Sequence, residues 1–303
     1  MKSKRSQIAV RVLFALAACA VCPLAMTALS AQAADANDPA SVFAKDNLVA
    51  WCIVPFDAAK RSPEARAEML QRLGIKSVAY DWRQEHVPTC AEEILAYERH
   101  GLDYFAFWSW HPAMAPLIEK YGIRPQIWMT APSPKAETEE AMVEAAGKAL
   151  LPLVEQAGKM GCRFGLYNHG GWGGEPKNLV AVCQWLRRSA KAEHVGIVYN
   201  FHHGHEHIGD FAECLAAMKP YLLCLNLNGM NDGANPKIVR LGKGEHEKAM
   251  MQTILESGYR GPIGILGHTS GEDIELVLRE NLEGMQRLLQ ELGDTAALQT
   301  YAK

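Results

Sequence analysis

The sequence predicts a single (β/α)8 barrel, the TIM-barrel architecture, from three observations. Eight short apolar runs recur along the chain, with amphipathic helical stretches between them. Each run is apolar almost throughout, as expected for parallel strands buried on both faces. Strict alternation of strands and helices is typical of a parallel sheet covered by helices. About 270 residues follow a predicted leader of 33 residues, which is the usual size of one such barrel.

The elements can be placed in order along the chain. Strands are expected over residues 51–56, 77–82, 104–110, 126–131, 163–169, 195–201, 222–228 and 263–268. Helices are expected over residues 137–159, 177–191, 208–218, 245–257 and 272–289. Two earlier helices are marked by their starts: Ser62 is a cap residue before Pro63, and Thr89 with Glu92 has the pattern of a capping box. The barrel domain is therefore expected over residues 47–295, after a linker over 34–46 and before a tail over 296–303.

Residues 1–33 are predicted to be a signal peptide. Basic residues precede an apolar stretch over 12–29, and Ala31-Gln32-Ala33 has the small-x-small form of a signal peptidase site. A lipoprotein acylated at Cys19 is the alternative, but the apolar run continues past Cys19, where lipoproteins normally become polar. No later segment approaches the roughly 18 apolar residues of a membrane-spanning helix. We expect an exported protein, periplasmic or secreted, without an integral membrane segment after leader removal.

Composition limits the classes of partner. The formal net charge is −3, which gives no electrostatic case for nucleic-acid binding. Six cysteines follow the leader, and they show no CxxC spacing. We interpret them as small buried side chains, and disulfide pairing cannot be read from their positions.

Polar residues end nearly every predicted strand. In the stretch VGIVYNFHHGHEH (residues 195–207), an apolar run leads to Asn200 and then to four histidines, of which His203 is one. Two other strands end in His169 and His268. Because α/β barrels carry their reactive groups at the carboxyl ends of the strands, we expect the site at this end of the barrel.

Three stretches resemble the xylose isomerase-like TIM barrels, the sugar isomerase/epimerase superfamily. They are NHGGWGGEP (168–176), GIVYNFHHGH (196–205) and LGKGEHEKAMMQTILESGYRGPIGIL (241–266). Members of that family commonly hold one divalent metal with Glu, Asp, His and Glu at the ends of strands five to eight. The matching positions here are Tyr167, Asn200, Asn226 and Leu266. Since Mg²⁺ and Mn²⁺ sites depend on carboxylate oxygen, the resemblance implies that this metal site is not kept, whereas Asn168-His169 and His203 do match.

The remaining polar residues favour a small neutral carbohydrate as the substrate. Amide side chains match sugar hydroxyls, and flat indole rings could stack on a sugar face. The candidate substrate-binding residues are Asp81, Trp110, Asn168, Trp172, Asn200, Asn226 and Asn228. Asn226 and Asn228 alternate along a strand, so both are expected to point toward the barrel axis.

Proton abstraction next to a carbonyl is the mechanism that fits these parts. His169 and His203 are the candidate bases, and His268 with amide donors would stabilise the enolate oxygen. The outcome is epimerisation or isomerisation when the proton returns, or elimination when a leaving group departs. The resemblance implies that elimination is an option, because some members of that family are lyases that act on keto-sugars. Two alternatives stay open. One is a carbohydrate-binding barrel without catalysis. The other is a hydrolase with a divalent metal such as Zn²⁺ on His169, His203 and His268.

Overall fold

Eight parallel strands close into a barrel in the computed structural model, which describes residues 41–302. The strands are β1 (Leu48–Trp51), β2 (Ser77–Asp81), β3 (Asp103–Trp108), β4 (Gln126–Thr130), β5 (Phe164–Tyr167), β6 (Val195–Asn200), β7 (Leu222–Leu227) and β8 (Ile263–Leu266). Each strand pairs in parallel with its neighbours in the chain, and β1 closes the barrel against β8. The predicted (β/α)8 barrel is therefore confirmed.

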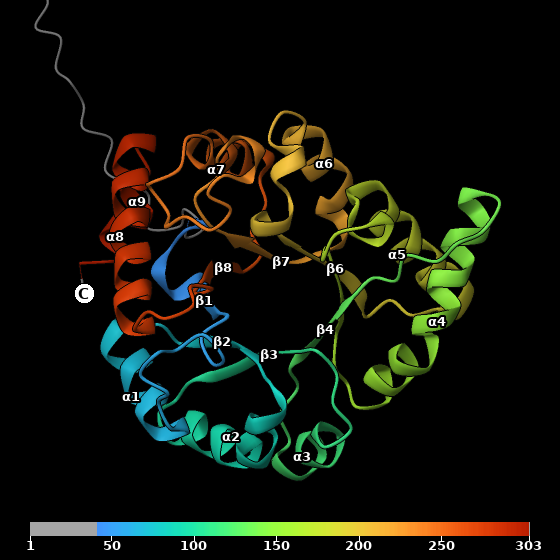
Figure 1. Cartoon of the computed structure of the whole chain (residues 1–303), viewed down its shortest axis with the longest axis horizontal. Coiled ribbons are helices and arrows are strands. Elements are labelled where there is room, and N and C mark those ends of the chain that lie inside the picture. Colours follow the sequence, from blue (N-terminus) through green and yellow to red (C-terminus); the bar gives the residue numbers. More distant parts are fainter. Residues whose placement is uncertain (1–40, 303) are drawn as a thin grey trace, which may run out of the picture. The chain divides into compact units, whose positions relative to one another are not determined.

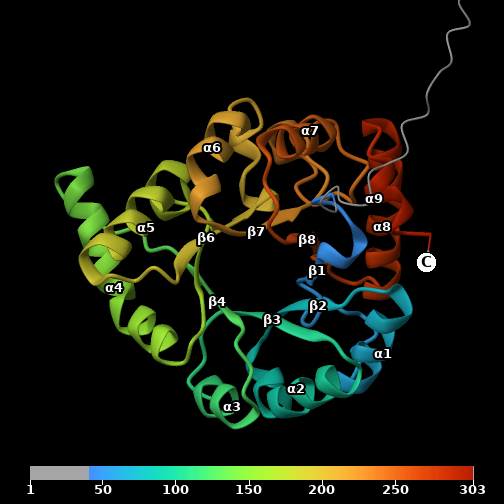
Figure 2. The same cartoon turned by 180° about the vertical axis from the view of Figure 1, so that it is seen from behind.

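Helices form the outer layer around these strands, as Figures 1 and 2 show from the two ends of the barrel. They are α1 (Pro63–Leu73), α2 (Cys90–Arg99), α3 (Met114–Tyr121), α4 (Glu139–Lys159), α5 (Pro176–Ala190), α6 (Phe211–Met218), α7 (Glu247–Ser257), α8 (Ile274–Leu292) and the short α9 (Thr295–Gln299). Ser62 caps α1 as expected, because its hydroxyl accepts the Ala65 N–H. The predicted Thr89 cap was wrong: the Thr89 hydroxyl donates to the carbonyl of His86 in the preceding turn.

The first strand begins and ends earlier than expected. The apolar run continues through Ile53 and Val54, but Cys52 has a φ of 57° and turns the chain out of the sheet. The strand therefore ends at Trp51, and the apolar residues after it cover the barrel wall. No helix of the described residues is long and apolar enough to cross a membrane.

The predicted signal peptide, with Cys19 and its cleavage site, and the first part of the predicted linker lie outside the described residues. The last part of that linker contains Phe43, which is fully buried. Tyr301, in the predicted tail, donates its hydroxyl to the carbonyl of Phe43. The two ends of the described chain therefore pack together beside α8 and α9.

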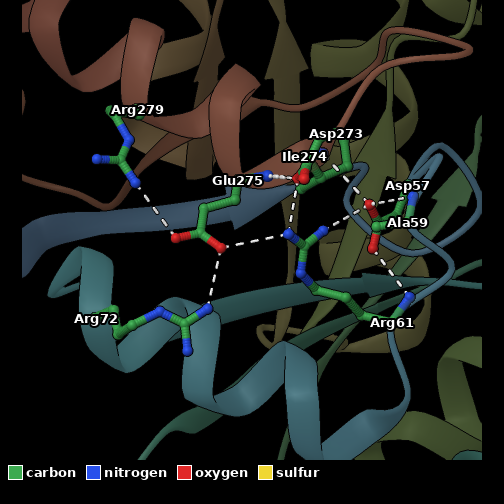
Figure 3. A network of polar contacts seen from close by, with 8 residues as sticks. All are labelled: Asp57, Ala59, Arg61, Arg72, Asp273, Ile274, Glu275 and Arg279. Atoms are coloured by element: carbon green, nitrogen blue, oxygen red, sulfur yellow. Dashed lines mark hydrogen bonds and ion pairs between the residues drawn. The ribbon is translucent and has the colours of Figure 1, made fainter.

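A charged network joins the connection between β1 and α1 to the first turn of α8 (Figure 3). The Arg61 guanidinium contacts the carboxylates of Asp57 and Asp273 at 2.8 Å each, and Glu275 at 3.3 Å. Arg72 of α1 contacts Glu275 at 3.0 Å. The buried Asp57 carboxylate also accepts backbone N–H groups from both sides of this junction. The network fixes α8 against the β1–α1 connection.

Aromatic side chains fill the barrel interior below the carboxyl ends of the strands. The rings of Trp51, Trp128 and Tyr167 pack with centroids 5.1–6.3 Å apart, and Trp108 joins them at 6.1 Å from Trp51. Gly165 makes room for Trp128, since a Cβ there would lie 2.9 Å from the indole ring. The interior is thus a packed aromatic floor, on which any site at this end of the barrel must rest.

Candidate active site

A cavity of about 110 Å³ lies at the carboxyl ends of the strands, above the aromatic floor. It is lined by Trp51, Cys52, Phe56, Asp81, Arg83, Trp108, Tyr167, His169, Asn200, His202, His203 and His268. A second cavity of about 220 Å³ shares His202 and His203 with the first and extends over the loops after β5, β6 and β7. The two histidines therefore separate an inner chamber from an outer one.

Four imidazole rings form a continuous chain across this region. The ring of His169 lies 4.5 Å from that of His203, which lies 4.5 Å from that of His202. His202 in turn lies 5.1 Å from His268, whose ring packs on Phe56 at 3.8 Å. The structure thus brings together all three histidines predicted as catalytic, and it adds His202. Sequence reasoning gave His202 no role, because only the short helical turn at Phe201–His203 turns both rings inward.

Burial keeps the imidazoles of His202, His203 and His268 neutral. It lowers the pKa of His202 to about 2 and that of His203 to about 3, and the neighbouring imidazoles add to both shifts. Burial also lowers the pKa of His268, and the nearby Arg83 charge acts in the same direction. A neutral ring has a free nitrogen lone pair at neutral pH, so each of these three rings can accept a hydrogen bond, and it accepts a proton where a negative charge develops beside it.

Asp81 supplies a carboxyl group to the same cavity from the end of β2. Its Oδ1 accepts the Val54 N–H at 3.4 Å, whereas the buried Oδ2 has no hydrogen-bond partner among the described residues. Burial raises the pKa of Asp81 to about 7, and the charge of Arg83 opposes this rise. A carboxyl with a pKa near neutrality can both donate and accept a proton, so its chemistry is broader than the sugar binding predicted for it.

Asn168 and Asn200 use their amides to hold the ends of β5 and β6 together. Asn168 donates to the Asn200 carbonyl at 3.0 Å and accepts the Asn200 N–H at 2.8 Å. Asn200 donates to the Tyr167 hydroxyl at 2.5 Å, and its Oδ1 accepts the His202 N–H at 3.0 Å. Asn168 is fully buried and does not line the cavity, so the structure gives it a positioning role in place of the expected substrate contact.

Four other residues predicted to bind substrate line neither cavity. Asn226 is buried beneath the site, where its Oδ1 accepts the Cys224 thiol at 3.5 Å. Asn228 follows the end of β7, and its amide donates to the Gly229 carbonyl at 2.8 Å. The Trp172 indole donates to Glu139 at 2.8 Å, and the Trp110 backbone N–H contacts the Met129 sulfur at 3.1 Å.

The indoles that line the cavity are those of Trp51 and Trp108. Trp108, Cys52 and Arg83 were not predicted as site residues. Whether these side chains reach the cavity depends on the exact residue at which β1, β2 and β3 end. The apolar periodicity carries no signal of that precision.

The positions that match the family's metal ligands do not fit a divalent cation here. Tyr167 packs among tryptophans, and burial raises its pKa far above the usual range. Leu266 is buried and apolar, while Asn200 and Asn226 offer only amides. Such neutral donors lack the carboxylate oxygens that hard cations require.

The predicted histidine ligands do not converge on one point either. Three or more potential ligand atoms come within 4.8 Å of one another in two places among residues 41–302, and neither includes His169, His203 or His268. The inner cavity is therefore lined by four imidazoles and one carboxyl group.

Solved structures with the same fold include sugar epimerases. No protein-family model and no curated protein matches the sequence. A 3-keto-D-glucoside 4-epimerase from E. coli superposes with a TM-score of 0.59 at 14% identity, over 80% of this chain and 100% of that one. A D-psicose 3-epimerase from Clostridium cellulolyticum H10, determined with D-tagatose, gives 0.53 at 12% identity, over 83% and 99%. An IolI protein with a bound zinc atom gives 0.62 at 12% identity, over 81% and 98%. The chain therefore has the xylose isomerase-like TIM-barrel fold.

Proposed function

We propose that this protein is an exported enzyme that epimerises or isomerises a keto-sugar, or eliminates a group from it, by removing a proton next to a carbonyl. The observation that carries the proposal is the inner cavity, where four imidazoles and the carboxyl of Asp81 line one small space. The sugar epimerases among the structures of the same fold support a carbohydrate as the substrate.

The barrel topology separates a base from an acid. In the closed order from β1 to β8, β2 and β6 lie four strands apart, on opposite sides of the barrel. Asp81 ends β2, and His203 follows β6, so the two groups approach a bound sugar from opposite faces. His169 contacts His203 and acts from the same side. This arrangement suits a proton removed from one face of a carbon and returned to the other.

The reaction then runs in two steps. His203, neutral because of its burial, takes the proton from the carbon next to the carbonyl, and the negative charge that develops on the substrate stabilises the imidazolium so formed. The electron pair of the broken C–H bond moves into an enolate, whose oxygen is stabilised by N–H donors such as His268 or His202. Protonated Asp81 returns a proton to the opposite face, which inverts the carbon. If the enolate expels a leaving group from the next carbon instead, the same first step yields elimination.

The proposal is tested by turnover of a keto-sugar panel that includes 3-keto-glucosides and ketohexoses. His203→Gln and His169→Ala are expected to lose activity by about two to four orders of magnitude, the usual contribution of a general base. His194→Ala is the matched control, because its ring contacts the Val154 carbonyl on the outer layer. Products distinguish epimerisation from elimination. Full activity in both variants would refute the assigned bases, and sugar affinity without turnover in the wild type would favour the binding barrel.

Export is a separate part of the proposal. It predicts that the mature protein isolated from the cell envelope begins directly after Ala33. A mature protein that keeps residues 1–33, or one acylated at Cys19, would contradict it.

A further inference from the structure

A group of side chains that could ligate a metal ion lies at the connection between β6 and α6, apart from the inner cavity. His207 lies in the turn His205–His207, Asp210 precedes α6, and Cys214 lies in the first turn of that helix. His207 Nδ1 is 3.1 Å from Asp210 Oδ1 and 3.6 Å from Cys214 Sγ. All three ligand atoms lie within 4.8 Å of one another.

The contacts of His207 leave its Nδ1 facing electron-rich atoms. The other ring nitrogen, Nε2, lies 3.1 Å from Glu175 Oε2, as expected for an N–H donated to this carboxylate. A neutral imidazole carries only one N–H, so Nδ1 then presents a lone pair. That lone pair meets the oxygens of Asp210 and the sulfur of Cys214. A cation at their common point would satisfy all three atoms at once.

The spacing of these atoms matches a tetrahedral zinc site. Zn–N and Zn–O bonds of about 2.0–2.1 Å and a Zn–S bond of about 2.3 Å place neighbouring ligand atoms roughly 3.3–3.6 Å apart. The observed separations from His207 Nδ1 are 3.1 Å to Asp210 and 3.6 Å to Cys214. A carboxylate on the far nitrogen of a ligating histidine is also the usual partner that fixes its ring. Glu175 provides this partner.

We propose that His207, Asp210 and Cys214 bind one zinc ion, that Glu175 orients His207, and that water takes the fourth position. The ion would tie the turn His205–His207 to α6. Because His207 also lines the outer cavity with His202 and His203, this bond would fix the rim of the active site. The site is thus structural, and it is independent of the proposed reaction.

The other group of potential ligands in the described chain lacks these features. Asp232 and Glu245 have side chains that are 83% and 70% exposed, against 51% for Asp210, and the group contains no sulfur, whereas Cys214 is buried. Without a thiolate, exposed carboxylates hold Zn²⁺ weakly in water. His246, the third member, therefore serves as a control position.

The test uses the tag-free full chain, stripped with chelator and then titrated with Zn²⁺ or Co²⁺. The proposal predicts one equivalent of tightly bound zinc. With Co²⁺ it predicts a near-ultraviolet thiolate-to-metal charge-transfer band. Cys214→Ser should abolish the band, Asp210→Asn should weaken binding, and Glu175→Gln should reduce affinity about 10–100-fold. Cys162→Ser and His246→Ala are the matched controls, and both should leave the band unchanged.

Two results would overturn the proposal. The first is a wild-type protein that binds no stoichiometric zinc. The second is a charge-transfer band that persists in Cys214→Ser or is lost in Cys162→Ser. Circular dichroism establishes that each variant is folded, and the isosteric Asp210→Asn gives an independent answer if Cys214→Ser does not fold.

Discussion

Asn168→Ala should destabilise the protein and disarrange its active site. The substitution removes both partners of the Asn200 backbone, the acceptor of its N–H at 2.8 Å and the donor to its carbonyl at 3.0 Å. Asn200 is 1% exposed, so water cannot readily replace either contact. Each buried backbone group left without a partner costs about 1–3 kcal/mol, which predicts a loss of about 2–6 kcal/mol in the free energy of unfolding.

Urea denaturation with linear extrapolation measures that loss, and activity at a temperature where the variant is folded measures the displacement of His202 and His203. Asn47→Ala is the matched control. The Asn47 amide donates to the Val42 carbonyl at 2.7 Å and to the Gly261 carbonyl at 2.9 Å, at the amino ends of β1 and β8, away from the cavity. This variant should lose similar stability while its folded form keeps its activity. A loss below about 1 kcal/mol in Asn168→Ala, or equal loss of activity in both variants, would refute the reasoning.

Three further predictions concern buried charge and close packing. Glu93→Gln should lower the free energy of unfolding by about 3–5 kcal/mol, because it leaves the buried Arg66 guanidinium without a counter-charge. The guanidinium lies 2.7 Å from the Glu93 carboxylate in the native protein. Urea denaturation measures the loss, and a loss under about 1 kcal/mol would contradict this. Asp81 has a folded-state pKa of about 7, above its ordinary 3.8, so its contribution to stability is complete below about pH 4 and is lost as the pH rises through 7. The difference amounts to roughly 4 kcal/mol; Asp81→Asn should remove this slope from the unfolding free energy between pH 4 and 8, and equal slopes in both proteins would argue against it. Gly264→Ala places a Cβ 1.8 Å from Asn226 Oδ1 and should cost about 1–3 kcal/mol, so an unchanged melting temperature would show that Asn226 moves freely.

The barrel could be predicted because its causes are local and repeated. Strands buried on both faces must be apolar throughout, and helices that cover them must be amphipathic, so the alternation is visible in the sequence. Boundaries were less certain. The first strand ends at Trp51 because Cys52 takes a left-handed conformation, and no sequence pattern marks a cysteine for that role.

The site could be predicted only in part. Residue type and position identified His169, His203 and His268 as residues at the carboxyl end of the barrel, since a polar residue that directly follows a buried strand lies where that strand ends. Hydrogen bonding decided the rest. The sequence favoured Asn168 as a sugar ligand, yet its amide nitrogen and oxygen both hydrogen-bond to the backbone of Asn200 at the end of β6. The acid–base character of Asp81 arises from complete burial and one unpaired oxygen, which depend on the packed structure.

Exchange of a substrate proton with solvent tests the central claim most directly. The purified protein is incubated in D2O with a keto-sugar that it binds, and NMR follows deuterium entering the carbon next to the carbonyl. The account predicts exchange in the wild type at or above the rate of net turnover, and its loss in His203→Gln but not in His194→Ala. Turnover without any incorporation of deuterium from solvent, or exchange that continues unchanged in His203→Gln, would contradict it.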